Sequence, residues 1–321
     1  MASRYAVRHT LGAKPDVFLC RDTCTDTCVV VKRNDTSSLS ADTDDTECKL
    51  YHLLHAAGGH PHILPLLDSF HDGDHAVALV LDYCPHGDLF DLVLANKRID
   101  VPVAVTFFGQ LASAVAALHA LGYAHGDLSL ENVLLGRHMQ VQLMDFGAAV
   151  PIDIPTTQVA GKCNYMAPEL FSGLPWDPAA ADVWALGMTL FAMLTGDFLL
   201  DDSVVQDPLL QILAQHGLRG VLQLMPRWHA LLPEAVVPLL EQMLQVDPRV
   251  RISMSAVLQY AQLLLSLVEQ HHRQSPTSPS NHHDKRHKIM RPRTLYRFND
   301  IYARPSASVP TASAAAFVHC V

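Results

Sequence analysis

The chain has 321 residues, of which 49% are apolar and 17% charged, and its formal net charge is −9. At about 100–200 residues per domain, this length predicts two domains, or one domain with appendages. A chain this apolar can bury a large core, which excludes a wholly disordered or fibrous protein. The acidic balance also argues against nucleic acid as a partner of the folded part.

The cysteine content and the start of the chain bear on location. There are seven cysteines, an odd number, and the first residues lack the apolar core and cleavage site of a signal peptide. Disulfides form mainly in oxidising compartments and use cysteines in pairs. We therefore expect an intracellular, cytoplasmic setting.

Short runs of β-branched and aromatic residues predict strands near the start of the chain. Residues 17–20 and 28–32 flank the polar turn Thr25-Asp26-Thr27, so a hairpin is expected. Ala76–Asp82 is a further predicted strand. Asp88 follows a glycine and precedes an apolar run, which is typical of the residue that caps a helix N-terminus.

Apolar segments predict helices at Val103–Leu121, Ala180–Leu194, Val236–Gln245 and Met254–Glu269. The first lies in a stretch, Val101–Gly126, without Asp, Glu, Lys or Arg, and about 20 apolar residues can span a bilayer. Polar residues within the stretch and the lack of a flanking basic cluster argue against a membrane span. A helix that is apolar all round also suits the centre of a large domain.

The C-terminal part of the chain differs in composition. Residues 271–321 hold 8 Lys and Arg against 2 Asp and Glu, and they are rich in Ser, Pro, His and Ala. Such a segment buries too little surface to offset its chain entropy, so residues 266–321 are expected to form a basic, flexible tail. Its basic cluster, Lys285–Lys288, could dock an acidic partner or act as a nuclear address, with simple solubility as the alternative.

A series of motifs between residues 29 and 251 resembles the protein kinases. Each motif is weak alone, but together they follow the family's order at fitting intervals and cover about residues 5–265. The motifs are Val29-Val30-Val31-Lys32, Glu47, His125-Gly126-Asp127 with Asn132, Asp145-Phe146-Gly147, Tyr165–Glu169, Asp182–Gly187 and Arg251.

The resemblance implies an α+β, bilobal fold. A small β-rich lobe would cover about residues 5–84 and a larger helical lobe about residues 85–265, within a kinase domain of residues 1–265. The apolar stretch Val101–Gly126 then becomes a buried helix that precedes the catalytic loop. The membrane alternative is thereby removed.

The resemblance also implies roles for single residues. Lys32, held by Glu47, would contact the phosphates of ATP, and Asp127 would accept the hydroxyl proton of the substrate. Asn132 and Asp145 would supply hard oxygen ligands, which suit Mg²⁺. The residues implied in nucleotide binding are Gly12, Val17, Val30, Lys32, Glu47, Asp82, Cys84 and Leu134.

Two departures from the family weaken parts of this assignment. Only Gly12 remains of the glycine-rich loop, and Pro15 removes one backbone amide donor, so a weaker grip on nucleotide is expected. Gly126 stands where the family has an arginine that usually receives an activation-loop phosphate. Control by such a phosphate is therefore in doubt.

Two further departures occur together. Kinases specific for serine and threonine have lysine and threonine where this chain has Ser129 and Lys162, and both features resemble kinases of some protists, oomycetes included. Because the two positions face each other in the family's active form, Lys162 could reach Asp127 and supply the displaced charge as a catalytic residue. A solvated Lys162 and a harmless Ser129 are the alternative.

The resemblance implies an enzyme that transfers the γ-phosphate of ATP to Ser or Thr hydroxyls of protein substrates. The alternatives are a pseudokinase scaffold that binds nucleotide weakly without turnover, and a small-molecule phosphotransferase of related fold. Asp88 and Glu131 lie where kinases that prefer basic substrates carry acidic residues. A helix cap and a solvated loop residue are the alternative roles for these two.

Overall fold

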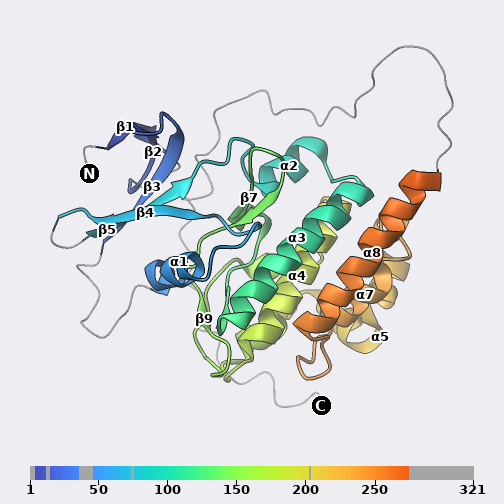
Figure 1. The fold of residues 1–321 in the computed structure, drawn as a ribbon. Coiled ribbons are helices and arrows are strands. Elements are labelled where there is room, and N and C mark those ends of the chain that lie inside the picture. Colours follow the sequence, from blue (N-terminus) through green and yellow to red (C-terminus); the bar gives the residue numbers. More distant parts are fainter. Residues whose placement is uncertain (1–3, 12–14, 36–45, 74–75, 202–203, 275–321) are drawn as a thin grey trace, which may run out of the picture.

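The computed structural model describes residues 4–11, 15–35, 46–73, 76–201 and 204–274, arranged as two lobes (Figure 1). Gly12 and the predicted tail beyond residue 274 lie outside the described residues. The expectations for the glycine loop and for the tail therefore stay predictions.

A five-stranded antiparallel sheet and one helix form the smaller lobe (Figure 1). The predicted hairpin is confirmed, because Val17 lies opposite Lys32 and Asp26 turns the chain with a φ of 62°. The strands in spatial order are β1 Tyr5–Thr10, β2 Val17–Asp22, β3 Cys28–Asp35, β5 Ala76–Asp82 and β4 Leu66–His71, and the helix is α1 Thr46–Ala56.

Strand β3 places Lys32 on the face of the sheet that lines the pocket between the lobes. Successive side chains of a strand point to opposite faces. Val29 and Val31 are buried in the outer core of the lobe, whereas Val30 and Lys32 line the pocket between the lobes. The two-residue period of the strand thus places Lys32 on the same face as Val30 and opposite to Val29 and Val31.

The larger lobe is helical and contains all four predicted helices, with bounds that differ by a few residues. It also contains two short strand pairs, β6 with β9 and β7 with β8. The helices are α2 Leu89–Asn96, α3 Val101–Ala120, α4 Pro178–Thr195, α5 Pro208–Leu224, α6 Pro226–Leu231, α7 Val237–Met243 and α8 Met254–Gln274. The short strands are β6 Tyr123–Ala124, β7 Val133–Leu135, β8 Val141–Leu143 and β9 Val150–Pro151, and 3₁₀ turns cover Leu130–Asn132, Cys163–Tyr165, Pro168–Ser172 and Val204–Gln206.

Helices α3 and α4 are long and apolar enough to cross a membrane by length and composition alone. Both lie in the middle of the helical lobe, where α3 packs against α4 on one side and α8 on the other (Figure 1). Gly109 on α3 allows this close approach, since a Cβ there would lie 2.9 Å from Leu265 of α8. The apolar composition of these helices is therefore explained by packing inside the lobe.

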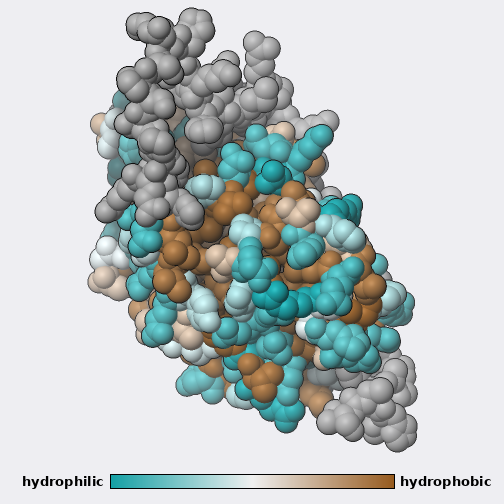
Figure 2. All heavy atoms as spheres, turned by 90° about the vertical axis from the view of Figure 1, so that its right-hand side faces the viewer, coloured by the Kyte–Doolittle hydropathy of each residue, from teal (hydrophilic) through white to brown (hydrophobic). Residues whose placement is uncertain are grey.

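Helix α8 continues to Gln274, past the predicted domain boundary at residue 265. The helix therefore includes the first residues of the tail predicted for 266–321, and the domain boundary at residue 265 stays a prediction. Apolar and hydrophilic side chains alternate on the side of the lobe that α8 forms (Figure 2). Leu263 and Leu267 of α8 remain exposed there.

Candidate active site

A lysine with two carboxylates joins the lobes at the base of the small sheet. The Lys32 Nζ of β3 lies 2.6 Å from Glu47 Oε1 of α1 and 3.0 Å from Asp145 Oδ1. Asn34 Nδ2 donates to the other Glu47 oxygen at 3.2 Å. Burial raises the pKa of the Glu47 carboxyl, and the Lys32 ammonium opposes that shift. The pairing predicted between Lys32 and Glu47 is thus present in the geometry.

The Asp-Phe-Gly segment is held by packing beneath α1. Phe146 is fully buried, and its ring lies 4.8 Å from that of Tyr51 and 5.6 Å from that of His125. Asp145 has a φ of 65°, a left-handed conformation, and its carboxylate accepts from Lys32. Local backbone strain of this kind needs surrounding packing to persist, and Phe146 supplies it.

Asp127 is oriented by the asparagine of its own loop. Asn132 Nδ2 donates to the Asp127 backbone carbonyl at 2.7 Å and to Asp127 Oδ2 at 2.9 Å. This leaves the amide oxygen of Asn132 on the opposite side from Asp127. The other carboxylate oxygen, Asp127 Oδ1, is buried and has no hydrogen-bond partner among the described residues. The Asp127 side chain as a whole is 21% exposed, so a substrate hydroxyl can reach its carboxylate and transfer a proton to it.

Asp182 anchors the loop to the core of the large lobe, a role that the sequence analysis missed. Its buried carboxylate on α4 accepts hydrogen bonds from the backbone N–H groups of His125 at 2.8 Å and Gly126 at 3.1 Å. It also lies 2.8 Å from Nε2 of His119. A single charged residue near the start of an otherwise apolar helix is the signal that could have revealed this contact.

Six of the eight nucleotide residues predicted from the sequence line one pocket between the lobes. Its upper wall comes from β2 and β3 and its lower wall from β7, and the chain linking the lobes closes its back. Glu47 lies behind this wall as the partner of Lys32. The lining residues are the predicted Val17, Val30, Lys32, Asp82, Cys84 and Leu134, together with Leu11, Leu64, Leu81, Tyr83 and Met144.

An ion pair ties the segment after the active site to the base of the large lobe. The guanidinium of Arg251 donates to both oxygens of Glu169, at 2.6 and 3.0 Å, and the Arg251 side chain is fully buried. Arg251 also donates to the carbonyls of Gln245 and Ala180 and lies over the ring of Trp184. Glu169 and Arg251, which both belong to the motif series found in the sequence, are thus paired in the structure.

A family model described as protein kinase domain matches residues 8–262. The chain belongs to the protein kinase family. It is 35% identical over 221 residues to a maternal embryonic leucine zipper kinase of Xenopus tropicalis, which covers 68% of this chain and 30% of that protein. It is 34% identical over 203 residues to the serine/threonine-protein kinase GIN4 of Saccharomyces cerevisiae, covering 63% and 17%. The chain spans less than a third of the length of these relatives.

Gly126 gives this kinase an unusual catalytic loop. The residue has a φ of 77°, and a Cβ built on it would lie 2.3 Å from the backbone carbonyl oxygen of Ala148. A side chain here would therefore need the backbone at Ala148, directly after Asp-Phe-Gly, to move. The glycine that replaces the family's arginine at this position therefore allows the catalytic loop to lie against the backbone at Ala148.

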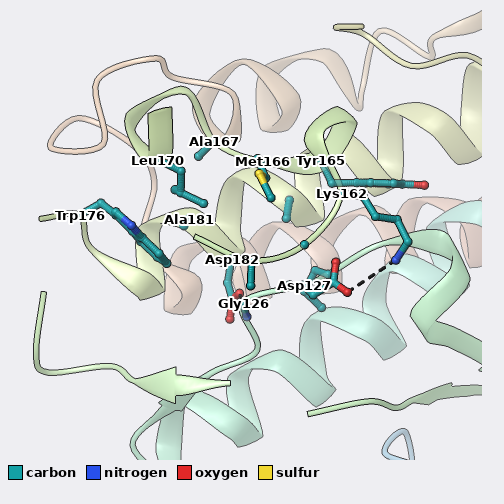
Figure 3. Close-up of a pocket in the computed structure, with 14 residues that line it drawn as sticks. Gly126, Asp127, Lys162, Tyr165, Met166, Ala167, Leu170, Trp176, Ala181 and Asp182 are labelled. Carbon is teal, nitrogen blue, oxygen red and sulfur yellow. Dashed lines mark hydrogen bonds and ion pairs between the residues drawn. The ribbon is translucent and has the colours of Figure 1, made fainter. Parts of the chain in front are cut away.

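Lys162 reaches into the site from the activation segment, which we define as residues 145–169. Its Nζ donates to Ser129 Oγ at 3.0 Å and lies 3.6 Å from Asp127 Oδ2 (Figure 3). The side chain of Ser129 is buried, while that of Lys162 is 29% exposed. The two departures from the family thus lie in contact with each other and next to Asp127.

Asp88 and Glu131 differ in how accessible they are. Asp88 Oδ1 accepts from the N–H of Asp91 at 2.8 Å, which confirms the helix-cap alternative, and the residue is only 1% exposed. Burial raises the pKa of Asp88 to about 7. Glu131 is half-buried and accepts from the Tyr165 hydroxyl at 3.2 Å. Of the two, Glu131 is the better placed to meet a substrate.

Proposed function

We propose that this kinase transfers the γ-phosphate of ATP to serine or threonine hydroxyls of protein substrates. The observation that carries the proposal is the presence of two hydrogen-bonded groups. Lys32 contacts Glu47 and Asp145, and Asn132 contacts Asp127. Phosphoryl transfer depends on positioning and on neutralising charge, and these residues supply both. A pseudokinase would not need both halves of this arrangement.

The oxygen ligands present are compatible with Mg²⁺. The Asp145 carboxylate accepts from Lys32, which lines the pocket between the lobes. The Asn132 amide nitrogen donates to Asp127, so the amide oxygen is directed away from Asp127. Carboxylate and amide oxygens are ligands that Mg²⁺ accepts. When bound, the ion would neutralise negative charge on the phosphates of ATP. The protein's own contribution is to hold these two side chains, through Lys32 and through the backbone of Asp127.

The reaction that these residues support is an in-line displacement. Asp127 orients the substrate hydroxyl and accepts its proton as the new oxygen–phosphorus bond forms. The bond from the γ-phosphorus to the bridging oxygen breaks, and ADP leaves with that electron pair. Lys32 stabilises the nucleotide phosphates, and Glu47 keeps its ammonium in place.

The substrate preference follows from the acidic residue that is not fully buried. Glu131 is half-buried and lies beside Tyr165, so a basic side chain near the phosphoacceptor is the matching chemistry. Asp88 would contribute only through a rearrangement of its helix cap. An intracellular location and a docking role of the tail remain predictions from composition.

The test is transfer of radiolabelled γ-phosphate to generic protein substrates, with the full chain and its Asp127→Asn variant. We expect transfer by the wild type and a loss of at least about 10²-fold in the variant, because a neutral amide cannot accept the proton. A wild type that binds ATP without transfer would establish the pseudokinase alternative. Transfer to small molecules but not to proteins would establish the second alternative.

A further inference from the structure

Two lysines flank the reacting centre, and each faces one of its two aspartates. Lys32 lies 3.0 Å from Asp145 on the nucleotide side, and Lys162 lies 3.6 Å from Asp127 on the side that receives the substrate. The two cations come from different lobes, one from β3 and one from the activation segment. Between them lies the place where a transferring phosphoryl group must pass.

We propose that Lys162 is a catalytic residue whose ammonium contacts the phosphoryl group during transfer. This inference rests on the proposed kinase activity and names a new part of its machinery. An ammonium has three donors, and the contacts with Ser129 and Asp127 occupy at most two of them. The third donor can bind an equatorial phosphoryl oxygen while Asp127 receives the hydroxyl proton. Lys162 stays protonated throughout, so the atoms and charges of the displacement balance as described above.

The backbone next to Lys162 is shaped to bring it this close. Gly161 has a φ of 105°, and a Cβ there would lie 2.9 Å from Asp127 Oδ1 and 3.3 Å from the carbonyl of Gly126. Only a glycine permits both the conformation and the approach. The activation segment therefore lies against the catalytic carboxylate, and the next side chain along it is Lys162 (Figure 3).

The contact with Ser129 distinguishes this lysine from an ordinary surface lysine. Ser129 is 1% exposed, so its hydroxyl is an acceptor available only from inside the site. Holding the ammonium there costs side-chain entropy, which a solvated lysine would avoid. A preorganised cation next to developing negative charge needs no reorganisation at the moment of reaction. The serine thus acts as a positioning residue for the lysine.

The first experiment measures kcat and KM for ATP in four proteins. They are the wild type, Lys162→Met, Lys162→Thr, and the double variant that combines Lys162→Thr with Ser129→Lys. We expect Lys162→Met to lower kcat about 10²-fold, by analogy with loss of one oxyanion donor, with little change in KM. Adding Ser129→Lys to Lys162→Thr should restore a substantial part of kcat. The exposed Lys97→Met variant removes the same charge elsewhere and should leave kcat unchanged.

A second experiment tests the contact between Lys162 and the phosphoryl group without requiring turnover. Titration calorimetry with Mg²⁺ measures the affinity for ADP alone and for ADP with aluminium fluoride, a mimic of the transferring phosphoryl group. Lys162→Met should weaken binding of the mimic about tenfold and leave ADP binding unchanged. Equal affinities for the mimic in both proteins, a kcat within threefold of wild type, or a kcat that rises would each overturn the assignment. An inactive wild type whose mimic binding still depends on Lys162 would refute the proposed activity alone.

Discussion

Replacing Arg251 with methionine should destabilise the large lobe strongly without touching the reacting centre. The guanidinium donates to both oxygens of Glu169, to the Gln245 carbonyl and to the Ala180 carbonyl at 2.8 Å. Methionine fills much of the volume but supplies no donor. The substitution therefore leaves a carboxylate, only 12% exposed, without its counter-charge.

The size of the effect follows from that unpaired carboxylate. Removing one partner of a buried ion pair costs about 3–5 kcal/mol, against a total stability of about 5–15 kcal/mol for a typical protein. For a protein of this size, about 4 kcal/mol corresponds to a fall in melting temperature of roughly 10 °C. Glu169→Gln should cost less, since its side-chain oxygen can still accept from Arg251.

The assay is thermal unfolding of the full chain followed by circular dichroism. Arg249→Met is the matched control, because Arg249 pairs with Asp247 on the surface and its side chain is 83% exposed. Such exposed pairs contribute about 0–1 kcal/mol, so the control should melt close to the wild type. Equal melting temperatures for Arg251→Met and Arg249→Met would refute the reasoning.

Three further outcomes can be checked directly. Gly126→Ala should lower the free energy of unfolding in urea by more than the about 1–2 kcal/mol that positive-φ strain costs, since its Cβ would also clash with the Ala148 carbonyl. Because burial raises the pKa of Asp88 to about 7, the folded state keeps a proton that the unfolded state releases near pH 4. Stability should therefore fall as the pH rises from about 4 to 7, and Asp88→Asn, which retains the helix cap, should flatten this slope in urea midpoints. Burial also raises the pKa of Cys84 to about 12, so iodoacetamide should label the exposed Cys24 before Cys84, as peptide mass mapping would show.

Local patterns predicted the elements whose own residues carry the signal. The hairpin around Asp26, the strand Ala76–Asp82 and the cap of α2 follow from turn chemistry and β-branched runs. Strand β1 was missed because only Tyr5 of its six residues is buried, so its outward face shows no alternation. Helix α5 was missed too, and Gly217 breaks its helical pattern with a φ of 65°.

The motifs located the principal site residues, because their order along the chain is specific to a family. What the motifs could not show is contact between distant segments. That Asp182 of α4 accepts from the catalytic loop depends on tertiary packing, and so does the close approach of Gly126 to Ala148. The contact of Lys162 with Ser129 was anticipated only because two departures occurred together.

Because Asp182 binds two amides of the catalytic loop, the hydrogen exchange of those amides depends on the core of the large lobe. The amide hydrogens of His125 and Gly126 are held by a carboxylate on α4, a helix buried along nearly its whole length. A loop amide bonded only within its own turn exchanges with deuterium through small local fluctuations. These two amides can exchange only when α4 itself separates from the loop. In deuterium-exchange measurements they should therefore be protected as slowly exchanging core amides are, although they lie in a loop beside the reacting centre.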